Sequence, residues 1–89
     1  MEMSEAVLTD LIQRLRKVEG QVRGVQQMLA DQRDCRDVVT QISAASKALD
    51  HAGFLLVAAG LTWCVAKPDE SAAAGYSVPD VQRMFMKLA

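Results

Sequence analysis

Residues 34–65 read DCRDVVTQISAASKALDHAGFLLVAAGLTWCV, and this stretch decides the fold. No proline interrupts it, and Asp34 is placed to cap the first turn of a helix. Apolar side chains recur at alternating spacings of three and four residues, which predicts one long helix that packs along its length. The residues of this seam are Cys35, Val38, Ile42, Ala45, Leu49, Ala52, Leu56, Ala59 and Trp63.

The two cysteines of the chain, Cys35 and Cys64, lie near opposite ends of this predicted helix. They are 29 residues apart, which corresponds to roughly 43 Å along an α-helix. A disulfide needs Cα atoms within about 7 Å, so the two thiols cannot meet within one straight helix. Two copies packed antiparallel, centred near Leu49 and Asp50, would bring Cys35 of one chain beside Cys64 of the other, twice in a twofold dimer. The sequence therefore predicts an intersubunit dithiol site.

The composition favours a small protein that oligomerises. The 89 residues make one domain near the lower limit for a self-sufficient core. Hydrophobic residues make up 51% of the chain, more than a small protomer buries easily, so a dimer or tetramer is expected. Two cysteines and no signal peptide are typical of a reducing cytosol, and the apolar run 52–59 is too short to span a bilayer. We therefore expect a cytoplasmic protein without a membrane partner.

The rest of the chain predicts two further helices. The first covers about residues 5–30, and a short polar turn then folds it back on the second as a hairpin. Residues 66–77 are predicted to be a linker. Ser77 and Asp80 form a capping box, which opens a short helix at about 78–88. The expected fold is all-α: one domain, residues 1–89, which dimerises into an antiparallel four-helix bundle. Two such dimers are expected to pair into a tetramer.

A basic cluster lies on the first predicted helix. Between residues 14 and 23 the only acidic residue is Glu19, and the four basic residues are Arg14, Arg16, Lys17 and Arg23. On a single helix such charges are typical of a solvated face. An oligomer would repeat the cluster and could hold phosphates, although the net charge of the chain is only −1. Gly20 and Gly24 share a face of this helix, which favours close helix packing over backbone exposed to a phosphate.

Two stretches resemble a known family. They read RLRKVEGQVRGV at residues 14–25 and CRDVVTQISA at residues 35–44, and they are similar to the small all-helical bacterial repressors of the CsoR/RcnR/FrmR type. The resemblance implies an antiparallel dimer, usually paired into a tetramer, that binds operator DNA without a helix-turn-helix. It also implies that an inducer captured at the cysteines lowers DNA affinity. Arg14 and Arg16 match the DNA contacts of the family, and His51 occupies a third position that is usually basic.

The resemblance also bears on the inducer. Copper-sensing members carry a histidine four residues before the second cysteine, where this chain has Gly60. The N-terminal imidazole of nickel and cobalt sensors and the N-terminal proline of formaldehyde sensors are also missing from residues 1–4, which read MEMS. Two cysteines without a histidine are the pattern of the persulfide-sensing, CstR-like branch. The first prediction is therefore a sensor of reactive sulfur, in which Cys35 attacks sulfane sulfur and Cys64 of the other chain closes a bridge.

Two alternatives stay open. Two thiolates alone can bind Cu(I) linearly, in which case Cys35 and Cys64 are the metal ligands. A thiol-based sulfur carrier without DNA binding would use Cys35 in the same way, but the sequence places no general base near either cysteine. We therefore expect a repressor without catalytic residues or a resident cofactor. A single cysteine is typical of a buried core residue. The two cysteines indicate a functional site only because an antiparallel pair of chains would bring them together.

Overall fold

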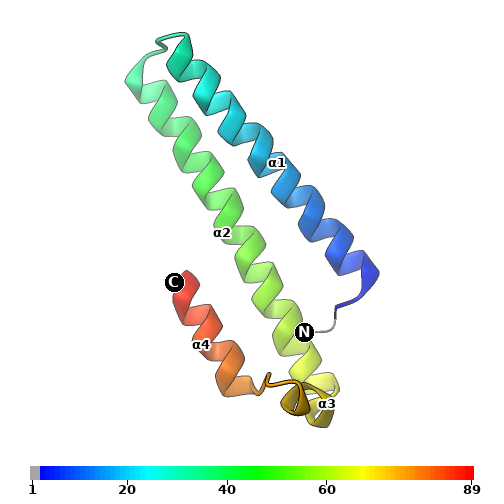
Figure 1. Ribbon diagram of the computed structural model, residues 1–89. Helices are drawn as coiled ribbons and strands as arrows, with labels where there is room; N and C mark the ends of the chain where they lie inside the picture. Colours follow the sequence, from blue (N-terminus) through cyan, green and yellow to red (C-terminus); the bar gives the residue numbers. More distant parts are fainter. Residues whose placement is uncertain (1–2) are drawn as a thin grey trace.

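The computed structural model describes residues 3–89, and within this range the chain forms four helices and no strand (Figure 1). Their bounds are Glu5–Ala30 for α1, Cys35–Ala66 for α2, Pro68–Ala73 for α3 and Val78–Leu88 for α4. The prediction of an all-α fold is confirmed. The molecule measures 54 × 25 × 14 Å along its principal axes. Its length is set by α2, whose 32 residues extend about 48 Å.

The two long helices form an antiparallel hairpin, and side chains cap both at their N-termini. The hydroxyl of Ser4 accepts a hydrogen bond from the amide of Val7 at 3.2 Å. The carboxylate of Asp34 accepts one from the amide of Arg36 at 2.8 Å. Both bonds satisfy amides that a helix N-terminus leaves without partners. The turn between the helices closes through Gln32, whose φ of 54° is left-handed.

The buried seam of α2 differs from the predicted one, because α2 packs against two different neighbours. From its N-terminus to just past its middle, α2 buries Val38, Ala45 and Ala52, and α1 lies along this part of the helix (Figure 1). Its C-terminal half buries Val57, Gly60 and Cys64 on the side of α4 (Figure 1). These two sets of buried residues overlap only partly with the single predicted seam. A spacing of three and four residues predicts a buried helix face, but it does not predict which neighbouring helix packs against each turn.

A second set of apolar side chains remains about half exposed in the single chain. Its members recur every seven residues on each helix and are between 40% and 60% exposed. Some of them line a groove between the two helices, together with Val18 and Ala45 at its floor. We call this set the open apolar face, and it consists of Leu8, Leu15, Val22, Leu29, Ile42, Leu49 and Leu56.

The length and composition of α2 would also suit a membrane span. That observation is weak, because the core helix of a soluble bundle passes the same test.

Gly20 and Gly24 of α1 do not pack against another helix within the described chain. A Cβ built on either glycine would meet no atom of residues 3–89 within 4 Å. The packing role that the sequence favoured for them is therefore not seen in the single chain. The bare backbone of both residues lies on the exposed surface of α1.

Residues 66–77, which were expected to form a linker, contain the short helix α3, so that prediction was wrong in this part. Pro68 opens α3 at a position where a missing amide costs nothing, and two acidic residues occupy its first turn. The side chain of Ser71 donates to the carbonyl of Pro68 at 3.1 Å, and Ser71 is buried. After α3 the chain reverses at Gly75, whose φ of +86° suits a residue without a side chain.

The last helix, α4, lies along the C-terminal half of α2 and does not contact α1 within the described range (Figure 1). The predicted capping box is present: the amide of Ser77 donates to Asp80 at 2.9 Å, and the amide of Asp80 donates to the Ser77 hydroxyl at 3.3 Å. The rings of Phe54 and Phe85 pack with their centroids 5.5 Å apart. Gly53 lets α4 approach closely, since a Cβ there would lie 3.1 Å from a methyl carbon of Leu88.

The capping box makes the first turn of α4 sensitive to acid. Hydrogen bonds from the hydroxyl and the amide of Ser77, together with the charge of Arg83, lower the pKa of the Asp80 carboxyl below its ordinary value of 3.8. The lowered pKa of Asp80 stabilises the folded state when the pH is above the ordinary pKa of the carboxyl. This stabilisation is lost as the pH falls through the lower pKa of the folded state.

We therefore expect α4 to lose amide protection as the pH falls below the ordinary pKa value of 3.8, and Asp80→Asn to remove that part of the pH dependence. Hydrogen exchange of residues 78–84 measures it. Asp69→Asn, which changes an acidic residue of α3 outside the capping box, is the control. If Asp80→Asn left the pH dependence of amide protection unchanged, the capping box would not be its cause.

Candidate inducer site and basic cluster

Cys35 is the first residue of α2 and is exposed. The helix N-terminus leaves backbone amides pointing towards it. Arg33 lies 3.8 Å from Asp37, so its charge is offset by a neighbouring carboxylate. Arg36 forms no ion pair with any of residues 3–89. The sulfur of Cys35 is therefore accessible, and the charges of two neighbouring arginines are balanced by Asp34 and Asp37.

Cys64 lies near the other end of α2 and is only 4% exposed. It packs against Val57 and Val81 in the core between α2 and α4. Its thiol donates a hydrogen bond to the carbonyl oxygen of Tyr76 at 3.1 Å. Cys64 therefore faces its own α4 and not the solvent.

The single chain does not bring the two thiols together. They lie near opposite ends of α2, and no group of three or more His, Cys, Asp or Glu side chains within residues 3–89 is arranged to hold a metal ion. Cys64 is buried against α4, whereas Cys35 is exposed. Each chain thus carries two half-sites.

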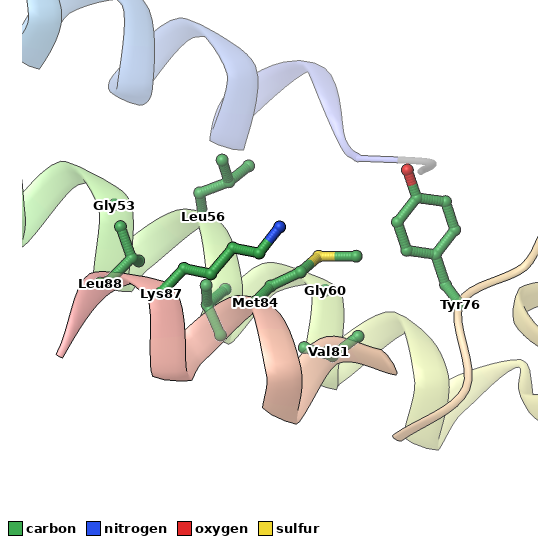
Figure 2. A pocket seen from close by; sticks show the side chains of 9 residues that line it. Gly53, Leu56, Gly60, Tyr76, Val81, Met84, Lys87 and Leu88 are labelled. Carbon is green, nitrogen blue, oxygen red and sulfur yellow. The ribbon is translucent and has the colours of Figure 1, made fainter. Parts of the chain in front are cut away.

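A groove between α2 and α4 lies beside Cys64, and its volume is about 350 Å³ (Figure 2). Val57 and Val81, which pack against Cys64, also line this groove. Gly60, one turn before Cys64, contributes only backbone to the groove wall. The lining is apolar apart from Lys87 and the ring of Tyr76, and its one soft donor atom is the thioether sulfur of Met84.

The basic residues on α1 are all exposed, but they differ in their partners. Arg14 pairs with Asp10 at 2.9 Å, and Arg23 pairs with Glu19 at 3.5 Å. Ion pairs on the surface are worth little, so both arginines can exchange partners. Arg16 and Lys17 form no ion pair with residues 3–89. They lie next to the bare backbone of Gly20 and Gly24, which is open to an approaching molecule.

His51 lies far from both thiols. It is exposed on α2 near the middle of the helix, more than 15 Å from each end at about 1.5 Å per residue. The residue that sequence reasoning missed is Tyr76. It lies in the stretch expected to be a linker, and it meets Cys64 through a backbone carbonyl, which leaves no trace in a pattern of side chains. The contact between the rings of Tyr76 and Trp63, with centroids 5.7 Å apart, was not predicted either.

The chain is similar to known proteins in both sequence and structure. Residues 8–87 match the family model described as metal-sensitive transcriptional repressor. The copper-sensing transcriptional repressor RicR of Mycobacterium tuberculosis is 46% identical over 54 residues, which cover 61% of this chain and 56% of RicR. The chain thus spans little more than half of that relative. The copper-sensing transcriptional repressor CsoR of Bacillus subtilis is 34% identical over 74 residues, which cover 83% of this chain and 73% of CsoR.

Solved structures resemble the chain over almost its whole length. The copper-sensing repressor CsoR with Cu(I) from Geobacillus thermodenitrificans NG80-2 superposes with a TM-score of 0.80 at 32% identity, covering 98% of this chain and 91% of that one. The nickel-responsive regulator InrS superposes with a TM-score of 0.79 at 22% identity, covering 100% of this chain and 98% of that one. At that identity InrS shows the fold alone.

Proposed function

Since the chain belongs to the metal-sensitive transcriptional repressor family, we propose that it is a cytoplasmic DNA-binding repressor that releases its operator when Cu(I) bridges Cys35 of one subunit and Cys64 of another. The names of two relatives, both copper-sensing repressors, support this metal. This proposal reverses the order of inducers predicted from the sequence, which put reactive sulfur first. No catalytic activity and no resident cofactor are proposed.

The observation that carries the proposal is the open apolar face, because its spacing fits an antiparallel pair. Placing Leu49 opposite its own copy sets Ile42 of one chain opposite Leu56 of the other. The same register brings Cys35 of one chain to within one residue of Cys64 of the other. A twofold dimer would therefore bury the face and assemble two dithiol sites in one step. Pairing of two such dimers would give the expected tetramer.

The donor set fits Cu(I). Two thiolates are soft ligands that bind this ion in a linear arrangement, and they need no third donor. Gly60 supplies none, so the site would hold Cu(I) with sulfur alone. Each thiol would release its proton to solvent as the Cu–S bond forms, so that the bound state carries two thiolates per ion.

The basic cluster on α1 is the proposed DNA contact, and a dimer would present it twice. Arg16 and Lys17 are free of ion pairs within residues 3–89, while Arg14 and Arg23 would exchange carboxylates for phosphates. The exposed backbone at Gly20 and Gly24 allows a phosphate to come close, which was the less favoured reading of these glycines. Release then needs a coupling of only about 1–3 kcal/mol between the sites, which lowers DNA affinity by about 5–150-fold.

Reactive sulfur remains the second candidate because of Gly60 and the groove beside Cys64. A bridge of several sulfur atoms between Cys35 and Cys64 would need more space than a single metal ion. The groove of about 350 Å³ that Gly60 lines provides space of that kind (Figure 2). A sulfur carrier without DNA binding is the third possibility, and it predicts no binding to any operator.

A DNA-release titration tests the proposal. Reduced protein on labelled DNA from the promoter of its own gene is titrated separately with Cu(I), an inorganic polysulfide and formaldehyde. We expect release to be complete at one Cu(I) per subunit, because each dimer holds two dithiol sites. Release by polysulfide alone would establish the second candidate instead. A protein that never binds the promoter would contradict both.

A further inference from the structure

Three interactions hold Tyr76, the residue that precedes the cap of α4. Its carbonyl accepts the hydrogen bond from the Cys64 thiol at 3.1 Å. Its amide donates to the carbonyl of Ser71 in α3 at 2.8 Å. Its ring packs against Trp63, the neighbour of Cys64 on α2. Two of these three interactions therefore tie Tyr76 to the end of α2 that carries the proposed inducer ligand.

The same residue is directly connected to the start of α4. Ser77, which follows Tyr76, is the N-cap and part of the capping box. Val81, one turn later, is 1% exposed and packs against Cys64 itself. A displacement of the Tyr76 carbonyl would therefore move the first turn of α4. Met84, Lys87 and Leu88 would then move as well, and these three side chains lie over the groove in Figure 2.

We propose that the hydrogen bond from Cys64 to the Tyr76 carbonyl is the device that couples inducer capture to the position of α4. This inference rests on the proposed function only in taking Cys64 as an inducer ligand. A sulfur that has bound Cu(I) has given its proton to solvent and can no longer donate this bond. The Tyr76 carbonyl then loses its donor in a partly buried place, which is costly for a backbone group.

The position of Cys64 adds a second reason for the coupling. Its sulfur lies in the core between α2 and α4 and is only 4% exposed, whereas Cys35 is exposed. A bridge between two chains therefore requires Cys64 to turn out of this core. The packing of Cys64 against Val81 and its hydrogen bond to Tyr76 would be lost in the same step. Tyr76 is thus a positioning residue, which acts through Cys64 and does not itself bind the inducer.

Hydrogen exchange of the full-length protein, read at residues 74–84, tests the proposal with two variants of one position. Cys64→Ser keeps a hydrogen-bond donor, whereas Cys64→Val fills a similar volume without one. We expect residues 74–84 of the metal-free Cys64→Val protein to exchange about fivefold or more faster than those of Cys64→Ser. Adding one Cu(I) per subunit to the unsubstituted protein should accelerate the same residues.

Residues 11–25 of α1 are the internal control, because a general loss of stability would accelerate them too, and circular dichroism checks that each variant is folded. Equal exchange of residues 74–84 in the two metal-free variants would overturn the coupling device. Acceleration confined to these residues supports it. The metal-free comparison does not depend on copper, so a failure of the proposed function appears separately, as an absence of Cu(I)-dependent release in the unsubstituted protein.

Discussion

Cys35→Ser is expected to abolish Cu(I)-dependent release of operator DNA. Cys35 is exposed at the start of α2 and belongs to no buried cluster within residues 3–89, so serine should not disturb the fold. The substitution leaves one thiolate per site, and one soft ligand cannot bridge two chains. The effect of Cu(I) on DNA affinity, about 5–150-fold for an ordinary coupling, should fall to about one. Fluorescence anisotropy of a labelled operator fragment, with and without Cu(I), measures it.

Gln41→Ala is the matched control for this experiment, because Gln41 is also exposed on α2 but carries no metal ligand. It should bind and release DNA as the unsubstituted protein does. A Cys35→Ser protein that still released DNA at one Cu(I) per subunit would show that Cys35 is not a ligand.

The second large effect is expected from Arg16→Ala combined with Lys17→Ala. Neither side chain has an ion-pair partner within residues 3–89, so both are free to bind phosphates, and their removal should weaken DNA binding on the order of tenfold or more. The weakening should be similar for all DNA sequences. Each lost phosphate contact should lower the slope of log affinity against log salt by about one, counted once for each bound subunit. Binding measured at several salt concentrations gives this slope.

Lys47→Ala controls for the change in net charge. Lys47 is exposed on α2, outside the basic cluster of α1, and the substitution removes one positive charge per chain. Its salt slope should stay close to that of the unsubstituted protein. If Lys47→Ala lowered the slope as much per charge as the double variant, the binding would follow total charge, and the assignment of α1 would be wrong.

The sequence predicted the long helices of the hairpin because their apolar residues repeat over many turns. The capping box of Ser77 and Asp80 was visible for a different reason, since it is a local pattern of side chains. Helix α3 has only six residues, too few for a repeat, and its one signal is a proline followed by two acidic residues. The division of α2 between two neighbours was hidden, because the same repeat is compatible with either one.

The candidate site was predictable only in part. The identity of Cys35 and Cys64, and their distance along one helix, could be read from the sequence. The orientation of Cys64 could not, because it depends on the backbone carbonyl of Tyr76, twelve residues away. Gly60 argues against a copper site that contains a histidine, whereas the names of the relatives favour copper as the inducer. A sequence pattern cannot decide between these two signals, since two thiolates suit both Cu(I) and sulfur chemistry.

The most direct test mixes two variants, each of which lacks one of the thiols. Homodimers of Cys35→Ser, or of Cys64→Ser, contain no complete site, whereas a mixed dimer contains one site built from the Cys35 and Cys64 of different chains. Cu(I) binding is measured against a competing chelator before and after the two proteins exchange subunits. The account predicts that tight binding appears only after exchange, at one Cu(I) per mixed dimer. Tight binding by either variant alone, or none after exchange has been verified, would contradict it.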